Sequence, residues 1–97
     1  MQFSFKVFRD SYILLAIADK DIVGKTFKSN DLEIFITKDF YHEDFCDDKK
    51  ALELIKQATI VNAMGKNIID LLVKEDFVKR ENVLKPCGVP HVQIVNM

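Results

Sequence analysis

Two histidines and two cysteines form the pattern with the most recognisable chemistry. His42 and Cys46 are four residues apart, and Cys87 and His91 repeat that spacing in reverse order. Four such side chains could form a tetrahedral zinc site. Structural zinc sites usually contain a closely spaced cysteine pair, which this chain lacks, and the acidic residues around His42 suit harder cations better. The alternative is a solvated acidic loop with two unrelated reduced thiols, and it predicts no metal and no cofactor.

A second candidate site is centred on His91. In a strand, His91 and Gln93 point to the same side of the sheet, directly after the rigid turn Gly88-Val89-Pro90. A histidine there could act as a general base, with Lys25 holding an anionic substrate. Its candidate nucleophiles are Cys87, Thr26 and Thr59. None of them is adjacent by a sequence rule, and the competing interpretation is a histidine bonded to backbone near the turn.

Gly24-Lys25-Thr26 resembles the end of a phosphate-binding loop. The full motif requires a glycine five residues before Gly24, and Asp19 stands there, so the backbone cradle for phosphates is missing. Gly24 is therefore expected to supply a turn with positive φ. Lys25 remains a candidate contact for a phosphate or a carboxylate.

Length and charge exclude several protein classes. The 97 residues allow a single domain, 1–97. Fourteen Lys and Arg against 15 Asp and Glu give a net charge of −1, which excludes a wholesale polybasic nucleic-acid binder. A hydrophobic content of 48% excludes an acidic disordered tail. No apolar run is long enough for a membrane helix, and the N-terminal pattern is strand-like, so we expect a cytoplasmic protein.

Charge is unevenly distributed along the chain. Acidic residues dominate 38–48, whereas basic residues occur at Lys6, Arg9, Lys25 and Lys28. A small basic patch is therefore compatible with the overall charge.

Alternation of apolar residues predicts the strands. Segments 2–9 and 12–18 should form an antiparallel hairpin, and 32–37 a third strand. Segment 19–30 is expected to be a turn or one helical turn followed by a loop, and 38–48 to be irregular. Two short strands, 82–85 and 91–95, are expected on either side of the turn at 86–90.

Helical spacing predicts two helices between these strand groups. Asp47 or Asp48 should cap a helix that begins near Lys49, and its apolar stripe continues to Val61. Gly65 suits the end of that helix, and Asn67 could cap a second helix over 68–76. A single helix bent at Gly65 is the alternative. The order predicts an α+β fold, a two-layer sandwich with two helices packed on one face of a mainly antiparallel sheet.

Asn62 interrupts the apolar run 58–64. If it is buried, its amide must be satisfied, so it is expected to bond a neighbouring loop. The alternative places Asn62 on an exposed binding face together with Thr59, one helical turn earlier.

The face of the sheet away from the helices is the most informative feature. In the expected register it carries Lys6, Phe8, Phe35, Thr37, His91 and Gln93. Aromatic rings set among basic and amide side chains are typical of platforms for single-stranded RNA. A face covered by segment 38–48 or by a partner protein is the alternative, and a one-residue slip in register would remove the platform.

Several stretches resemble a known family. They are Ile22-Val23-Gly24-Lys25-Thr26-Phe27, Phe40-Tyr41, Ala58-Thr59-Ile60-Val61-Asn62-Ala63-Met64-Gly65, Glu81-Asn82-Val83 and Gly88-Val89-Pro90-His91-Val92-Gln93. In order and spacing the chain resembles the small archaeal family catalogued as domain of unknown function 424. The resemblance implies an archaeal cytosolic protein with a two-layer fold and no known activity, often encountered in a translation-related context. Cys87 departs from the pattern, which has glycine there.

Three functions are compatible with these observations. The first is a non-enzymatic binding module that docks on the ribosome or a translation factor by protein or local RNA contacts. Its expected binding residues are Lys6, Lys25, Lys28, Thr26, Asn62, His91 and Gln93. The second is a small enzyme centred on His91, which requires segments 24–27 and 88–93 to share a pocket. The third is a structural homo-oligomer with exposed phenylalanines at its interface.

Overall fold

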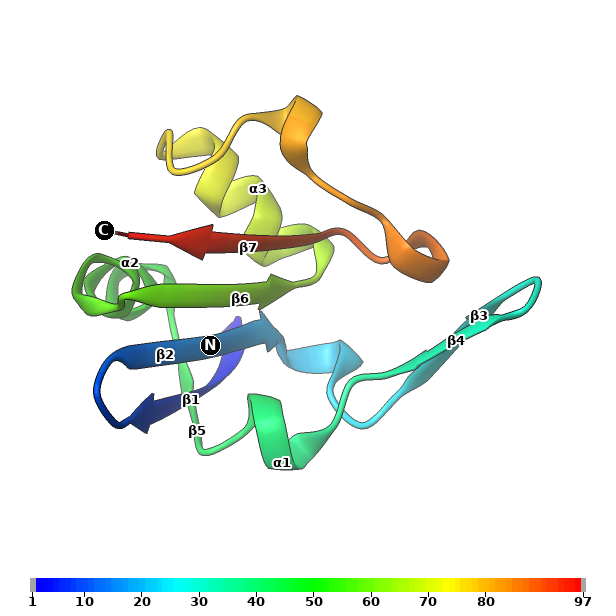
Figure 1. The fold of residues 1–97 in the computed structure, drawn as a ribbon, viewed down its shortest axis with the longest axis horizontal. Coiled ribbons are helices and arrows are strands. Elements are labelled where there is room, and N and C mark those ends of the chain that lie inside the picture. The colour runs from blue at the N-terminus through cyan, green and yellow to red at the C-terminus, as the bar shows by residue number, and fades with distance from the viewer. Residues whose placement is uncertain (1, 97) are drawn as a thin grey trace.

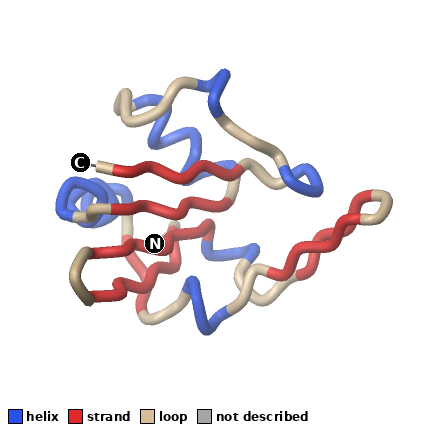
Figure 2. Tube along the Cα trace, in the orientation of Figure 1, coloured by secondary structure: helices blue, strands red, loops and turns tan. Residues whose placement is uncertain are grey.

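The computed structural model describes residues 2–96 and contains one five-stranded sheet and one separate hairpin (Figures 1 and 2). The strand order in the sheet is β5-β1-β2-β6-β7. The strands are β1 (Phe3–Arg9), β2 (Ile13–Asp19), β5 (Asp44–Cys46), β6 (Ile60–Met64) and β7 (His91–Val95). Only β2 and β6 pair in parallel among these neighbours. The predicted mainly antiparallel α+β fold is therefore confirmed.

Two helices, α2 (Asp48–Gln57) and α3 (Lys66–Lys74), pack on the same side of this sheet. Phe3 and Leu15 point to that side and lie in one buried core with Ile55, Ile68 and Leu72 from the helices. The alternation that predicted the first hairpin thus also determines which face the helices cover.

The predicted start of the first helix is confirmed, but its predicted end is wrong. The Asp47 carboxylate accepts a hydrogen bond of 2.9 Å from the backbone N–H of Lys50, as an N-cap does. The helix ends at Gln57, because Ala58 is already extended, and the apolar run that follows forms β6. A short run in a central strand with apolar residues on both faces has no alternation to distinguish it from a helix.

Gly65 begins α3 and does not end α2. Its φ of +119° lies in a region that favours glycine, and the buried carboxylate of Asp19 accepts hydrogen bonds of 2.8 Å from both Asn67 N and Ile68 N. The end of β2 therefore caps α3, in place of the predicted Asn67 side chain. Burial raises the pKa of Asp19 above its usual value, although these two backbone donors oppose the shift.

The segment predicted as a loop after β2 contains a strand. A 3₁₀ turn, η1 (Lys20–Ile22), is followed by β3 (Thr26–Ser29), which pairs with β4 (Leu32–Phe35). This hairpin projects away from the main sheet in Figure 1. The predicted third strand is therefore real, but it belongs to a separate two-stranded sheet.

Two further segments differ from expectation. Segment 38–48 contains the single-turn helix α1 (Lys38–Tyr41) and the edge strand β5. Segment 82–85 is not a strand, because η2 (Arg80–Asn82) occupies its start and Leu84 makes only one isolated bridge to His91. The turn that follows is η3 (Pro86–Gly88), in which Cys87 has a φ of 51°, a conformation that glycine adopts without strain.

A second core lies on the other side of the sheet. Ala16, Ala18 and Met64 are buried there against Tyr41 of α1 and Val89, with Phe27 of the hairpin packed beside them. Among residues 2–96, no helix has the length and hydropathy that spanning a bilayer requires.

Candidate functional site

The sheet face opposite α2 and α3 carries three rows of side chains, and we call it the open face although Ser4, Ala16, Ala18 and Met64 are buried on it. The register gives the rows Ser4–Ala18–Met64–His91, Lys6–Ala16–Asn62–Gln93 and Phe8–Leu14–Ile60–Val95, and β5 adds Phe45 beside Ser4. None of these side chains is a carboxylate, whereas Lys6 and His91 are basic. Within these rows the charged side chains are therefore positive, while the exposed residues Asp39 and Glu43 lie beside the β1 edge.

Helix α1 covers part of the open face and fixes three of its side chains. The Tyr41 hydroxyl donates a 2.6 Å hydrogen bond to Oδ1 of Asn62. The Phe40 ring stacks on Phe8 with centroids 5.4 Å apart. Lys6 Nζ donates to the carbonyl of Asp39 and lies 5.0 Å from the centroid of Phe8. A cation, two stacked rings and an amide are thus held close together.

The row that begins at Phe8 is left accessible. Phe8, Leu14 and Ile60 are only partly buried, and Gln93 and Val95 at the β7 end are exposed. The polar row through Lys6 runs directly beside it. This accessible strip therefore places apolar and polar side chains side by side at the surface.

The open face unites four of the residues predicted to bind and excludes the others. Lys6, Asn62, His91 and Gln93 all lie on it. Phe35 and Thr37, predicted on the same face, instead belong to the hairpin and the segment after it. Lys25, Thr26 and Lys28 also belong to the hairpin side of the molecule, where Lys28 lies 3.6 Å from Glu33.

The two segments of the His91-centred alternative are neighbours, but Lys25 and His91 do not line one hollow. Strand β3 does pack near η3, and Phe27 and Val89 share a core. His91, however, donates from Nδ1 to the carbonyl of Ala63 at 3.0 Å and lines a hollow with Phe77 and Leu84. Lys25 is exposed and does not line that hollow.

The four zinc-ligand candidates are separated by the fold. Cys46 is buried on β5, and His91 lies on β7 at the opposite edge of the sheet. His42 bonds Ser4, and the Cys87 thiol contacts the carbonyl of Leu32. Within residues 2–96, no three potential ligands gather around a common point. The metal alternative is therefore wrong for these four residues.

Comparison with known proteins now identifies the family. Residues 8–97 match the family model described as "Protein of unknown function (DUF424)". The chain belongs to the DUF424 family. A crystal structure of an uncharacterized conserved protein from Methanopyrus kandleri is similar to this chain, with a TM-score of 0.84 and 21% identity over 100% of this chain and 95% of that one. That likeness concerns the fold alone. No curated protein matches the chain significantly.

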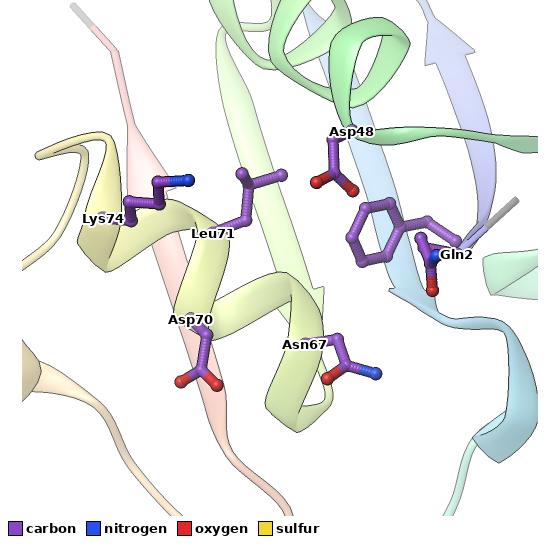
Figure 3. Close-up of a pocket in the computed structure, with 7 residues that line it drawn as sticks. Gln2, Asp48, Asn67, Asp70, Leu71 and Lys74 are labelled. Atoms are coloured by element: carbon purple, nitrogen blue, oxygen red, sulfur yellow. The ribbon is translucent and has the colours of Figure 1, made fainter.

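The DUF424 chain also has a hollow on its helix side, between the start of α2 and α3 (Figure 3). It measures about 280 Å³ and is lined by Gln2, Phe3, Asp48, Asn67, Asp70, Leu71 and Lys74. Asp70 is paired with Lys66 at 3.5 Å and Arg80 at 2.9 Å, and the hydrogen bond from Arg80 lowers its pKa. Asp70 is therefore paired, and the remaining charged groups of the lining, Asp48 and Lys74, have opposite signs.

A smaller hollow at the β5 end of the open face was missed from the sequence of this DUF424 protein. Six residues line its volume of about 220 Å³: Ser4, Lys20, Val23, Lys38, His42 and Phe45. They come from β1, η1, α1, β5 and the connections between them. Most of these elements were assigned to turns or irregular segments, and no spacing rule joins their residues.

A buried thiol, Cys46, and a buried phenol, Tyr41, predict a loss of stability at alkaline pH. Burial raises the pKa of Cys46 to about 11, with a smaller contribution from Asp47, and burial raises the pKa of Tyr41 to about 12. The unfolded chain loses these protons first, near the usual pKa values of 9.0 and 10.0. The stabilisation is therefore fully present below the pKa values of the unfolded chain and is lost as the pH rises toward the pKa values of the folded protein.

We expect the free energy of unfolding to drop by about 3 kcal/mol between about pH 8 and about pH 11, since each pKa unit corresponds to about 1.4 kcal/mol. Urea unfolding at both pH values measures the drop. Tyr41→Phe and Cys46→Ala should each reduce it, while Cys87→Ala, which changes the less buried thiol, should leave it unchanged. Equal stability of the unmodified protein at both pH values would contradict the expectation.

Proposed function

We propose that this DUF424 protein is a non-enzymatic binding module whose open face binds single-stranded RNA. The observation that supports it most is the absence of carboxylates from the three rows of that face, where Lys6, aromatic rings and amides lie together. Single strands are bound by stacking of bases on rings and by basic groups along the backbone.

The contacts on the open face suit this chemistry. Phe8 and Phe40 are partly exposed rings already stacked on one another, so a base can extend the stack. Lys6 Nζ lies beside Phe8 and can pair with a phosphate. Asn62 accepts from Tyr41 through its oxygen, which leaves its amino group to donate, and Gln93 is free at the exposed end of the row.

Hydrogen bonding of the two histidines supports a binding function over catalysis. Ser4 Oγ donates to the Tyr41 carbonyl, so its contact of 2.8 Å with His42 Nδ1 must be donated by the imidazole. A histidine that donates to a serine does not activate it as a nucleophile. His91 Nδ1 is likewise engaged by the Ala63 carbonyl.

Lys6→Glu is expected to weaken RNA binding about tenfold or more, because it removes a phosphate contact and places a carboxylate beside the rings. Fluorescence anisotropy with a labelled single-stranded RNA measures the affinity, at about 50 mM and about 200 mM salt. Lys56→Glu is the matched control, since Lys56 is exposed on α2, on the covered side of the sheet. An equal loss of RNA affinity in both variants would show that only the net charge matters, and it would contradict the assignment of binding to the open face.

The partner in the cell that we propose is the translation machinery, by docking on the ribosome or on a translation factor. Co-sedimentation with ribosomal particles from an archaeal lysate tests this step separately. At low salt the protein should sediment with the particles, and Lys6→Glu should reduce the bound fraction. Absence from every ribosomal fraction would overturn the docking while leaving RNA binding to be judged by anisotropy.

A further inference from the structure

The hollow at the β5 end of the open face gathers positive groups that no ion pair neutralises. Among residues 2–96 the ion pairs are Lys28–Glu33, Lys66–Asp70 and Arg80–Asp70, so neither Lys20 nor Lys38 has a carboxylate at contact distance. The ammonium of Lys20 lies 5.2 Å from the centroid of the Phe45 ring. Both lysines and Phe45 line the same hollow.

No acidic side chain of the described residues lines this hollow. Asp19, which precedes Lys20, turns its carboxylate toward the start of α3. Asp21 lines an adjoining hollow that it shares with Lys20. Asp44 lies on the other face of the sheet, because it pairs in register with Phe5, whereas Phe45 pairs with Ser4.

His42 is oriented by its neighbours and keeps one ring nitrogen unused. Its Nδ1 is engaged by Ser4 Oγ at 2.8 Å, and its ring is tilted against Phe45 with centroids 4.6 Å apart. Because Nδ1 carries the proton, Nε2 of the neutral ring is left to accept a hydrogen bond from a ligand. The lining thus combines two ammonium groups, an imidazole and an aromatic ring.

We propose that this hollow binds a phosphate monoester. Two ammonium groups match the charge of about −1.5 to −2 that such a group carries near neutral pH, and the imidazole can accept a hydrogen bond from a protonated phosphate oxygen. The Phe45 ring offers an apolar surface to the organic part of the ester. This site goes beyond the proposed function, because it needs no contact of RNA with the Phe8 row.

The phosphate monoester has two sources, a free phosphorylated small molecule or the 5′ end of an RNA. Titration of the ¹⁵N-labelled protein with inorganic phosphate, adenosine 5′-monophosphate and two RNA oligonucleotides, one 5′-phosphorylated and one with a 5′-hydroxyl, distinguishes them. If the phosphorylated oligonucleotide binds more tightly than the other three probes, the source is the RNA end. If the mononucleotide binds as tightly as the phosphorylated oligonucleotide, the source is the free ester.

In either case, backbone signals of Lys20, His42 and Phe45 should shift in a saturable way. Lys20→Gln and Lys38→Gln should each weaken monophosphate binding about tenfold, the loss expected for one hydrogen bond to a charged group. Lys50→Gln, which changes an exposed lysine on α2, is the matched control. Thermal melting of each variant verifies that it is folded.

The site is overturned if no probe shifts these signals saturably, or if Lys50→Gln weakens binding as much as the two pocket variants. Lys6→Glu separates the two proposals, since it should reduce binding of the 5′-hydroxyl oligonucleotide and leave binding of the mononucleotide unchanged. Failure of RNA binding with intact mononucleotide binding would therefore overturn the open-face proposal alone.

Discussion

Replacing Gly65 with alanine is expected to lower the free energy of unfolding by about 3–5 kcal/mol. Two costs combine at this position. The φ of +119° is unfavourable for any residue with a Cβ, and that Cβ would lie 2.5 Å from Cγ of Asp19. Asp19 is held by two hydrogen bonds to α3, so it cannot move aside without losing them.

Gly88→Ala separates the two costs. Gly88 also has a positive φ, +81°, but an added Cβ there meets nothing within 4 Å. The free energy of unfolding of Gly88→Ala should therefore fall by only about 1–2 kcal/mol, from backbone strain alone. Urea denaturation of both variants makes the comparison, and equal losses would show that Asp19 and Gly65 are not in close contact.

Asp19→Ala is expected to lower the free energy of unfolding by about 2–4 kcal/mol. The substitution leaves the N–H groups of Asn67 and Ile68 without their acceptor at a site that is 3% exposed. Asp47→Ala is the matched control, because Asp47 caps α2 through one bond at an exposed site and should cost about 1 kcal/mol.

Combining Gly65→Ala with Asp19→Ala tests the contact directly. Without the Asp19 carboxylate, the added methyl group has room, so the double variant should be more stable than the sum of the two losses predicts. Strictly additive losses would contradict the contact between Gly65 and Asp19. A loss below about 1 kcal/mol for Asp19→Ala would contradict the role of Asp19 as the cap of α3.

Local patterns predicted the parts of the fold that depend on local physics. The hairpin of β1 and β2 follows from alternation and a short polar turn, and the start of α2 follows from Asp47 as an N-cap. Strand β6 was beyond this reasoning, because Ile60–Met64 carries apolar residues on both faces and Asn62 is its single polar residue. The cap from Asp19 joins residues 48 and 49 positions apart, a distance that no local rule spans.

Local patterns likewise predicted some residues of the candidate sites and not others. Alternation in β1 placed Lys6 and Phe8 on one face, and alternation in β7 placed His91 and Gln93 together. Phe35 was assigned to that face only because β4 was expected in the main sheet. The hollow around Lys20 and Lys38 depends on how η1, α1 and β5 meet, and those short elements carry little signal of their own.

The central claim is that the open face binds single-stranded RNA, and chemical-shift mapping tests it most directly. An unlabelled RNA oligonucleotide is added to the ¹⁵N-labelled protein at low salt, and the shifts of backbone signals are followed residue by residue. We predict the largest shifts at Lys6, Phe8, Asn62 and Gln93, with the exposed surfaces of α2 and α3 unaffected. Shifts centred on α2 and α3, or no shifts at all, would contradict it.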